Sequence, residues 1–124
     1  MCYENRSNMS APRVPRPGKP VRGSATGRPV MALLDLLGRR WTLRAIWELR
    51  ENRSLNFRDL LAACDISPSV LNTRVAELRE AGIVDHDGEG YILTAHGNDL
   101  LNRLMPLHDW ADAWAKRTTA KVSR

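Results

Sequence analysis

The sequence predicts a mostly α-helical fold that carries one small β-hairpin. Apolar residues recur at helical spacing in five separate stretches, which is the signature of amphipathic α-helices. Two of these stretches are separated by only a few residues, so two short helices must cross steeply there. Two short apolar runs flank Asp87-Gly88-Glu89-Gly90, and glycine-rich turns of this kind join antiparallel strands.

The first two helices are expected over residues 29–38 and 42–51. The first has apolar side chains on both faces, including Met31 and Leu34. A short helix of that kind is usually covered by something beyond its own domain. Thr42 is expected to be the N-cap of the second helix.

A short extended piece at residues 54–55 leads into a helix, a tight turn and a second helix. The first of these helices is expected over residues 56–64 and the second over residues 67–82. Ser67 is a good N-cap, and Pro68 suits the first helical position, where its missing N–H costs nothing. In DNA-binding proteins the second helix of such a pair enters the major groove.

A last helix is expected from Thr94 to about residue 117, after the hairpin. Pro106 should kink or split it. Its large apolar side chains exceed what a core of this size can bury, so we expect a second copy of the chain to cover them. The residues predicted at this homodimer interface are Met31, Leu34, Leu104, Leu107, Trp110 and Trp114.

The positive charge of the chain is concentrated at its N-terminus. The formal net charge is +5; residues 1–28 hold six Lys and Arg against one Glu, whereas residues 29–124 hold 13 of each sign. Residues 1–28 are also rich in Pro and Gly, so we predict a disordered basic tail, a domain over residues 29–117 and a frayed C-terminus over residues 118–124. The tail is either a solubilising extension, which an upstream start codon would also produce, or an arm that follows DNA phosphates.

The composition argues against several classes of protein. No apolar run approaches the roughly 18 residues that a membrane span needs, and no signal peptide is evident. Two cysteines cannot form a disulfide framework or a zinc site, which favours a reducing, cytoplasmic location; Cys64 completes an apolar face and is expected to be a buried structural thiol. The three histidines lack metal-site spacing, and HExxH, CxxC and GxSxG motifs are absent. We therefore expect no catalysis, no metal and no cofactor.

The second helix of the tight pair has a small, polar outward face. Leu71 and Val75 face the core, so Ser69 and Thr73 lie on the opposite side. Small polar side chains can bond base edges and phosphates without blocking the approach to a groove, and Arg74 is a long donor beside them. An ordinary solvated helix face is the alternative. The predicted DNA-binding residues are Ser67, Ser69, Asn72, Thr73 and Arg74, with Arg39, Arg40 and Arg58 as phosphate clamps.

The order helix, helix, short strand, helix, helix, hairpin, helix is that of a winged helix-turn-helix domain (α-α-β-α-α-β-β-α). Over roughly residues 29–117 the sequence also resembles the HxlR-type (MarR-related) bacterial transcriptional regulators, most specifically in the string ISPSVLNTRVAELREAGIV. Further landmarks are Leu36-Leu37-Gly38 before Trp41-Thr42-Leu43, Phe57 with Leu60, Leu93-Thr94 with Gly97, and the run Leu104-Met105-Pro106-Leu107-His108-Asp109-Trp110.

The resemblance implies a homodimer that is assembled through its first and last helices and binds a palindromic operator. Two departures from the family pattern stand out. Gly27-Arg28-Pro29 occupies the place where family members often carry a thiol-sensing cysteine. The family's wing is usually longer and basic, whereas this hairpin is short and holds Asp85, Asp87 and Glu89, which phosphate would repel.

We therefore predict a sequence-specific regulator of transcription, a repressor that binds double-stranded DNA as a homodimer. One alternative is a winged-helix protein-interaction module without DNA binding, which the uncharged domain and the acidic hairpin favour. Another is a thiol- or ligand-responsive switch that acts through Cys64 or through a small-molecule effector, of unknown identity, bound near Trp110 and Trp114.

Overall fold

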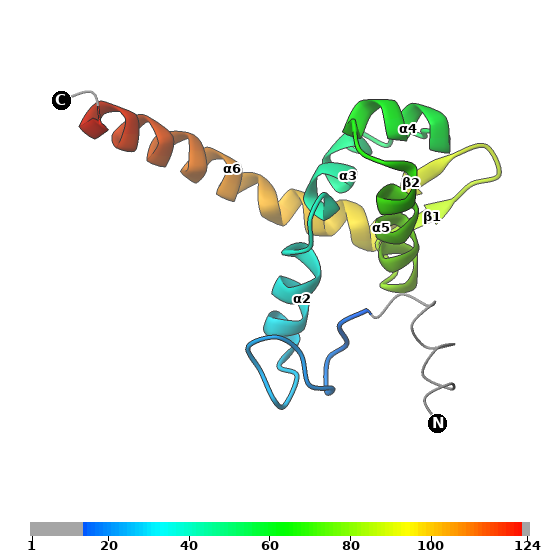
Figure 1. Ribbon diagram of the computed structural model, residues 1–124, viewed down its shortest axis with the longest axis horizontal. Helices are drawn as coiled ribbons and strands as arrows, with labels where there is room; N and C mark the ends of the chain where they lie inside the picture. The colour runs from blue at the N-terminus through cyan, green and yellow to red at the C-terminus, as the bar shows by residue number, and fades with distance from the viewer. Residues whose placement is uncertain (1–13, 123–124) are drawn as a thin grey trace.

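The computed structural model describes residues 14–122 and confirms the predicted order of elements (Figure 1). Within that range none of the helices combines the length and the hydropathy needed to cross a bilayer. The elements are helices α2 (Pro29–Leu37), α3 (Thr42–Glu48), α4 (Phe57–Cys64) and α5 (Pro68–Glu80), strands β1 (Val84–His86) and β2 (Tyr91–Leu93), and helix α6 (Ala95–Val122).

Helices α3, α4 and α5 surround the centre of the core, as the apolar spacing predicts. The side chain of Asn56 accepts the N–H of Asp59 at 2.8 Å and begins α4, while Ser67 accepts the N–H of Val70 at 3.3 Å and begins α5. Asp65 ends α4 with a φ of 56°, which turns the chain sharply into the second helix. The largest fully buried apolar side chains are Ile46, Leu49, Leu60, Leu71 and Leu78.

The hairpin is antiparallel, with Val84 opposite Leu93. Leu55 pairs with Tyr91 through two backbone hydrogen bonds of 3.1 and 2.7 Å, so the extended piece predicted before α4 joins the edge of the hairpin. A Cβ on Gly90 would lie 2.7 Å from the carbonyl carbon of Leu55. Only glycine at position 90 therefore allows the extended piece at residues 54–55 to pack this closely against the hairpin.

One local expectation is wrong, and of the kink or split expected at Pro106 the split does not occur. Thr42 is not an N-cap: Trp41 takes that position with a φ of 71°, and Thr42 is the buried first residue of α3. Pro106 does not split the last helix, because α6 runs unbroken through it. Because Pro106 has no N–H, the carbonyl of Asn102 loses its usual hydrogen-bond donor. Both residues are exposed, so water can replace the missing hydrogen bond.

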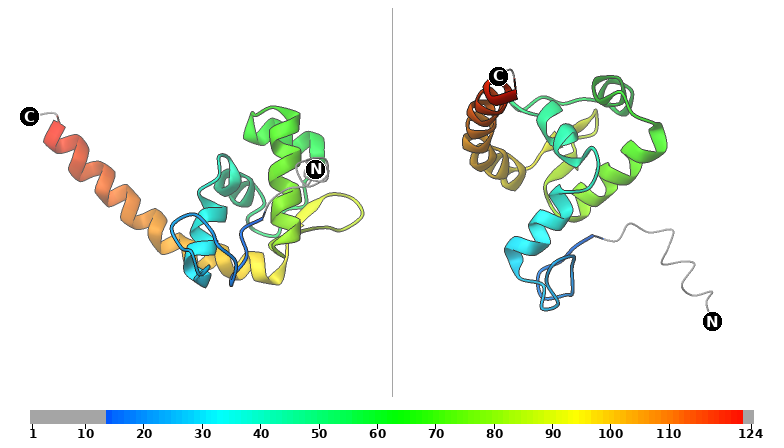
Figure 2. Two further views of the ribbon diagram at one scale, coloured as in Figure 1. Left: turned by 60° about the horizontal axis from the view of Figure 1, so that its bottom comes forward. Right: turned by 60° about the vertical axis from the view of Figure 1, so that its left-hand side comes forward.

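Only the first part of α6 belongs to the body of the domain. A Cβ on Gly97 would lie 2.1 Å from the carbonyl oxygen of Ile83, so the start of α6 lies directly on the chain that enters β1. Leu100, Leu101 and Leu104 pack against the core. From residue 107 to residue 119 every side chain is exposed, and the helix extends away from the other elements (Figures 1 and 2).

Residues 14–28 form a loop with its own hydrogen bonds, inside the range predicted to be a disordered tail. The N–H of Gly18 donates to the carbonyl of Gly27 at 2.8 Å, and Val21 and Ser24 bond each other through both backbone groups. The rest of that tail, residues 1–13, lies outside the described residues. Helix α6 likewise continues to Val122, beyond the predicted start of fraying at residue 118.

Candidate DNA-binding interface

The outward face of α5 is small, polar and exposed. Ser69, Asn72 and Thr73 are all exposed. The hydroxyl of Thr73 donates to the carbonyl of Ser69 at 3.0 Å, which leaves its lone pairs free to accept. The exposed hydroxyl of Ser67 accepts the capping bond at the start of the same helix. This face offers both donors and acceptors to a partner.

Arg74, the long donor predicted to bind DNA, is engaged within the domain. Its Nε donates to the carbonyl oxygen of Arg40 at 2.8 Å, and its Nη1 donates to Oε1 of Glu77 at 2.8 Å. The other carboxylate oxygen of Glu77 accepts Nη1 of Arg39 at 2.5 Å. Only 3% of the Glu77 side chain is exposed, so two guanidinium groups neutralise one buried carboxylate.

This Arg39–Glu77–Arg74 triad ties α5 to the turn between α2 and α3. Sequence reasoning missed the role of Glu77, because acidic side chains are rarely buried and Glu77 falls in the polar half of its helix. The spacing of Arg74 and Glu77, three residues apart on one helix, was the available signal. Of the predicted phosphate clamps, Arg39 is thus committed to the triad together with the predicted donor Arg74, whereas Arg40 and Arg58 are exposed.

The acidic character of the hairpin has a structural cause. The carboxylate of Asp87 accepts the backbone N–H groups of Glu89 at 2.9 Å and Gly90 at 2.8 Å, and the hydroxyl of Ser54 at 3.1 Å. The backbone donors, first that of Glu89, hold the pKa of Asp87 below its ordinary value. Asp87 therefore builds the turn and keeps its negative charge.

Most of the residues predicted at a dimer interface are exposed. The exposed fractions are 54% for Leu34, 60% for Leu107, 57% for Trp110 and 52% for Trp114. The rings of the two tryptophans lie nearly parallel, at 13° and with their centroids 6.1 Å apart. Met31 and Leu104 are instead half-buried, and Leu104 packs on the core. Val30 and Leu43, which the sequence reasoning left out, are exposed too.

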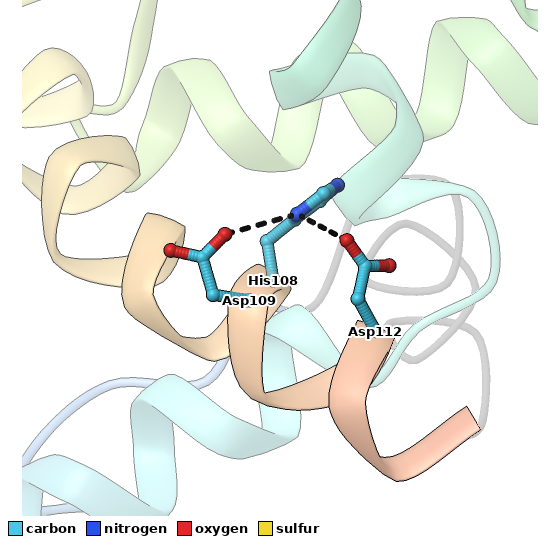
Figure 3. A group of neighbouring side chains, drawn as sticks. All are labelled: His108, Asp109 and Asp112. Carbon is cyan, nitrogen blue, oxygen red and sulfur yellow. Dashed lines mark ion pairs between the residues drawn. The ribbon is translucent and has the colours of Figure 1, made fainter. Parts of the chain in front are cut away.

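Figure 3 shows a group that sequence reasoning did not find, His108 with Asp109 and Asp112 on α6. Nδ1 of His108 lies 3.8 Å from an oxygen of Asp109 and 3.6 Å from one of Asp112. The spacing at i, i+1 and i+4 brings three potential metal ligands together. All three residues are exposed and come from one surface helix, so we assign no metal to them.

The comparisons with known proteins indicate the same family. The family model described as HxlR-like helix-turn-helix matches residues 36–119. The chain is 24% identical over 96 residues to an uncharacterised HTH-type transcriptional regulator of Methanocaldococcus jannaschii, covering 74% of this chain and 91% of the relative.

Solved structures agree with that family. The quinone-bound structure of YodB from B. subtilis has a TM-score of 0.65 at 28% identity and covers 68% of this chain and 97% of YodB. A protein described as a possible HxlR family transcriptional factor from Thermoplasma volcanium has a TM-score of 0.62 at 29% identity, covering 71% of this chain and 85% of that one. A MarR family regulator of Enterococcus faecalis shares the fold, with a TM-score of 0.63 at 24% identity.

Proposed function

Since this chain belongs to the HxlR-like helix-turn-helix family of DNA-binding transcription regulators, which are not enzymes, we propose that it is a repressor that binds a palindromic operator as a homodimer. The proposal requires a cytoplasmic location, where the protein meets the genome. Repression would follow from covering a promoter.

The observation that carries this proposal is the contrast between the two sides of α5. Leu71 and Leu78 are fully buried, while Ser69, Asn72 and Thr73 are exposed on the opposite side. We assign base contacts to these three residues, because a carboxamide and small hydroxyl groups pair with base edges in the major groove.

Backbone contacts are assigned to Ser67 at the start of α5 and to the exposed Arg40 and Arg58. Arg39 and Arg74 act indirectly, because the bonds they make to Glu77 hold α5 against its neighbours.

The dimer is proposed from the exposed apolar residues of α2 and α6. Leu34, Leu107, Trp110 and Trp114 are each more than half exposed, and large exposed apolar side chains that gather on one surface mark interfaces. A two-fold dimer repeats each contact, so its two α5 helices would enter successive major grooves about 34–36 Å apart. A palindromic operator is the expected consequence.

Selection of bound fragments from the source genome tests the proposal. We expect one palindromic sequence to bind at least about 10³-fold more tightly than random DNA at physiological salt. An Asn72→Ala, Thr73→Ala variant should lose this preference, whereas Arg103→Ala, on the exposed surface of α6, should keep it. If no fragment binds more tightly than random DNA, the protein-interaction module is the better interpretation.

We also propose a small-molecule effector, because the similar protein YodB is known in a quinone-bound form. We do not propose that the effector reacts with Cys64. This residue is buried, and burial raises the pKa of its thiol, which leaves little reactive thiolate. We assign the effector to an apolar hollow of about 260 Å³ between α3 and α6, lined by Trp47, Leu104 and Leu107 among others, because Leu107 also belongs to the proposed interface.

Titration of the protein–DNA complex with benzoquinone and with its hydroquinone tests this second proposal. Release of DNA by both the wild type and Cys64→Ser would support an effector that does not need the thiol. Retention of DNA at saturating concentrations of both compounds would remove a quinone-like effector.

A further inference from the structure

The two flanks of α5 face different parts of the domain. A helix turns by about 100° per residue, so Asn72 and Arg79 lie on one side of the outward face and Glu77 lies on the other. Arg79 is 3.6 Å from Asp85 of β1, so its flank faces the hairpin. Glu77 bonds Arg39, so its flank faces the turn between α2 and α3.

The N-terminal loop, residues 14–28, lies on the flank of Glu77. Arg16 of this loop is ion-paired with Glu80 at the end of α5, and Figure 1 shows the blue start of the loop beside that end. The first two residues of the loop line a hollow together with Arg39. The loop thus continues the surface that begins at the turn.

Arg16 also changes the charge of the outward face itself. The residues on that face are Ser69, Thr73, Ala76 and Glu80, of which Glu80 alone is charged. Its pairing with Arg16 offsets the negative charge that would otherwise meet the edge of a DNA groove.

The charges on the two flanks are opposite in sign. The loop contains Arg16, Lys19, Arg22 and Arg28 and no Asp or Glu. Arg16 and Arg22 are ion-paired with Glu80 and Asp35, so Lys19 and Arg28 carry the net positive charge of this flank. The hairpin, residues 84–93, contains three carboxylates and no Lys or Arg. Duplex DNA carries one negative charge per about 1.7 Å of its axis, so it is attracted to the first flank and repelled by the second.

We propose that the N-terminal loop and Arg40 form a phosphate-binding surface that adds to the contacts of Ser67 and Arg58 and takes the place of the hairpin. The inference rests on the proposed function, since it takes α5 to be the helix in the major groove. It deepens that function by giving general affinity to one flank, while Ser69, Asn72 and Thr73 supply sequence preference. The partner of this surface is the sugar–phosphate backbone of double-stranded DNA.

The salt dependence of operator binding tests the assignment. In the full-length chain, a Lys19→Ala, Arg28→Ala variant, which keeps the Arg16–Glu80 and Arg22–Asp35 pairs, should flatten the slope of log K against log salt by about 0.9 for each phosphate that is no longer neutralised. The slope should therefore flatten by about 2 for one protomer and by about 4 for a dimer. The ratio of operator to random-DNA affinity should stay within about twofold, because backbone binding does not depend on sequence.

A matched control removes the same two charges elsewhere. Lys116→Ala, Arg117→Ala lowers the net charge equally but lies on the extended part of α6, and we expect its slope to equal that of the wild type. Equal flattening by both variants would mean that only net charge matters, and an unchanged slope in the loop variant would overturn the inference. Should the loop variant fail to fold by circular dichroism, Lys19→Ala alone repeats the test, with a change of about 0.9 per protomer.

A second test adds a positive charge to the hairpin instead of removing charges from the loop. Glu89 is exposed at the tip of the hairpin, and Glu89→Lys would add a phosphate contact there if the tip reached DNA. We expect the slope to remain unchanged, and a steepening by about 1 per protomer would show that the hairpin binds the backbone after all.

The proposed function and this inference fail in different ways. If the proposed function is wrong, the wild-type protein selects no sequence. If only the inference is wrong, the loop variant selects the operator with the salt slope of the wild type.

Discussion

Replacing Glu77 by Gln should destabilise the domain strongly, because it removes the one negative charge between two guanidinium groups. Glu77 accepts Arg39 at 2.5 Å and Arg74 at 2.8 Å. A carboxamide can accept from one of them but turns an N–H group towards the other, so two cations face each other without a counter-charge.

The expected loss follows from the burial of the three side chains. Removing one partner of a buried ion pair costs about 3–5 kcal/mol. The side chains of Arg39 and Arg74 remain 22% and 20% exposed, so water partly replaces the missing acceptor. We therefore expect the free energy of unfolding to fall by about 2–3 kcal/mol.

Urea unfolding monitored by circular dichroism at one protein concentration measures this loss. The midpoint should fall by about 1 M or more, and the melting temperature by about 10 °C or more. Glu80→Gln is the control, since it makes the same change on the same helix but breaks only the exposed pair with Arg16, which is worth about 0–1 kcal/mol. Equal destabilisation by the two variants would refute a stabilising triad.

Four further predictions concern the site and its surroundings. Asn72→Ala should reduce discrimination between the operator and a mismatched site by about 1–3 kcal/mol, measured by fluorescence anisotropy, while binding to random DNA stays the same. Leu107→Asp combined with Trp110→Ala should give a monomer in sedimentation; a persisting dimer would move the interface elsewhere. The lowered pKa of Asp87 means that its contribution to stability is present above the unfolded value of 3.8 and is lost as the pH falls through the lower folded value. Asp87→Asn should therefore flatten the acid limb of the stability profile, measured by thermal unfolding. Cys64, buried and with a raised pKa, should react with a thiol reagent only as fast as the domain opens, and reaction at the rate of a free thiol would contradict its burial.

Features governed by neighbouring residues could be predicted from the sequence. Ser67 caps α5 as expected, and Asn56 caps α4 in the same way, because a cap depends only on a side chain and the backbone N–H three residues later. The hairpin follows in the same way from its turn residues and the apolar runs around them. The exposed polar face of α5 follows from helical periodicity alone.

Features that depend on distant parts of the chain could not be predicted. Arg39 and Glu77 are 38 residues apart, and no local pattern indicates that the turn before α3 meets α5. Arg74 was therefore expected to face DNA, whereas folding brings it two acceptors. Residues 14–28 present the same problem: their composition predicts disorder, but Arg16 meets Glu80 64 residues further along the chain.

The exposure of the residues proposed for a homodimer interface could be predicted only in part, for a related reason. Leu104 and Leu107 have the same residue type and lie three residues apart, yet Leu104 packs on the core and Leu107 is 60% exposed. The boundary between them is the point where α6 leaves the body, and the other helices determine that point.

The unbroken course of α6 also has a geometric consequence for evolution. Its 28 residues span about 42 Å at about 1.5 Å per residue, and Trp110 and Trp114 lie on the part beyond the body. If two copies join there, each α6 is a spacer that sets the distance between the two DNA-binding domains. Deleting one residue between Leu104 and Trp110 would shorten the spacer by about 1.5 Å and rotate one half by about 100°. Operator spacing and helix length would then have to change together, so insertions and deletions in this part of α6 would be poorly tolerated.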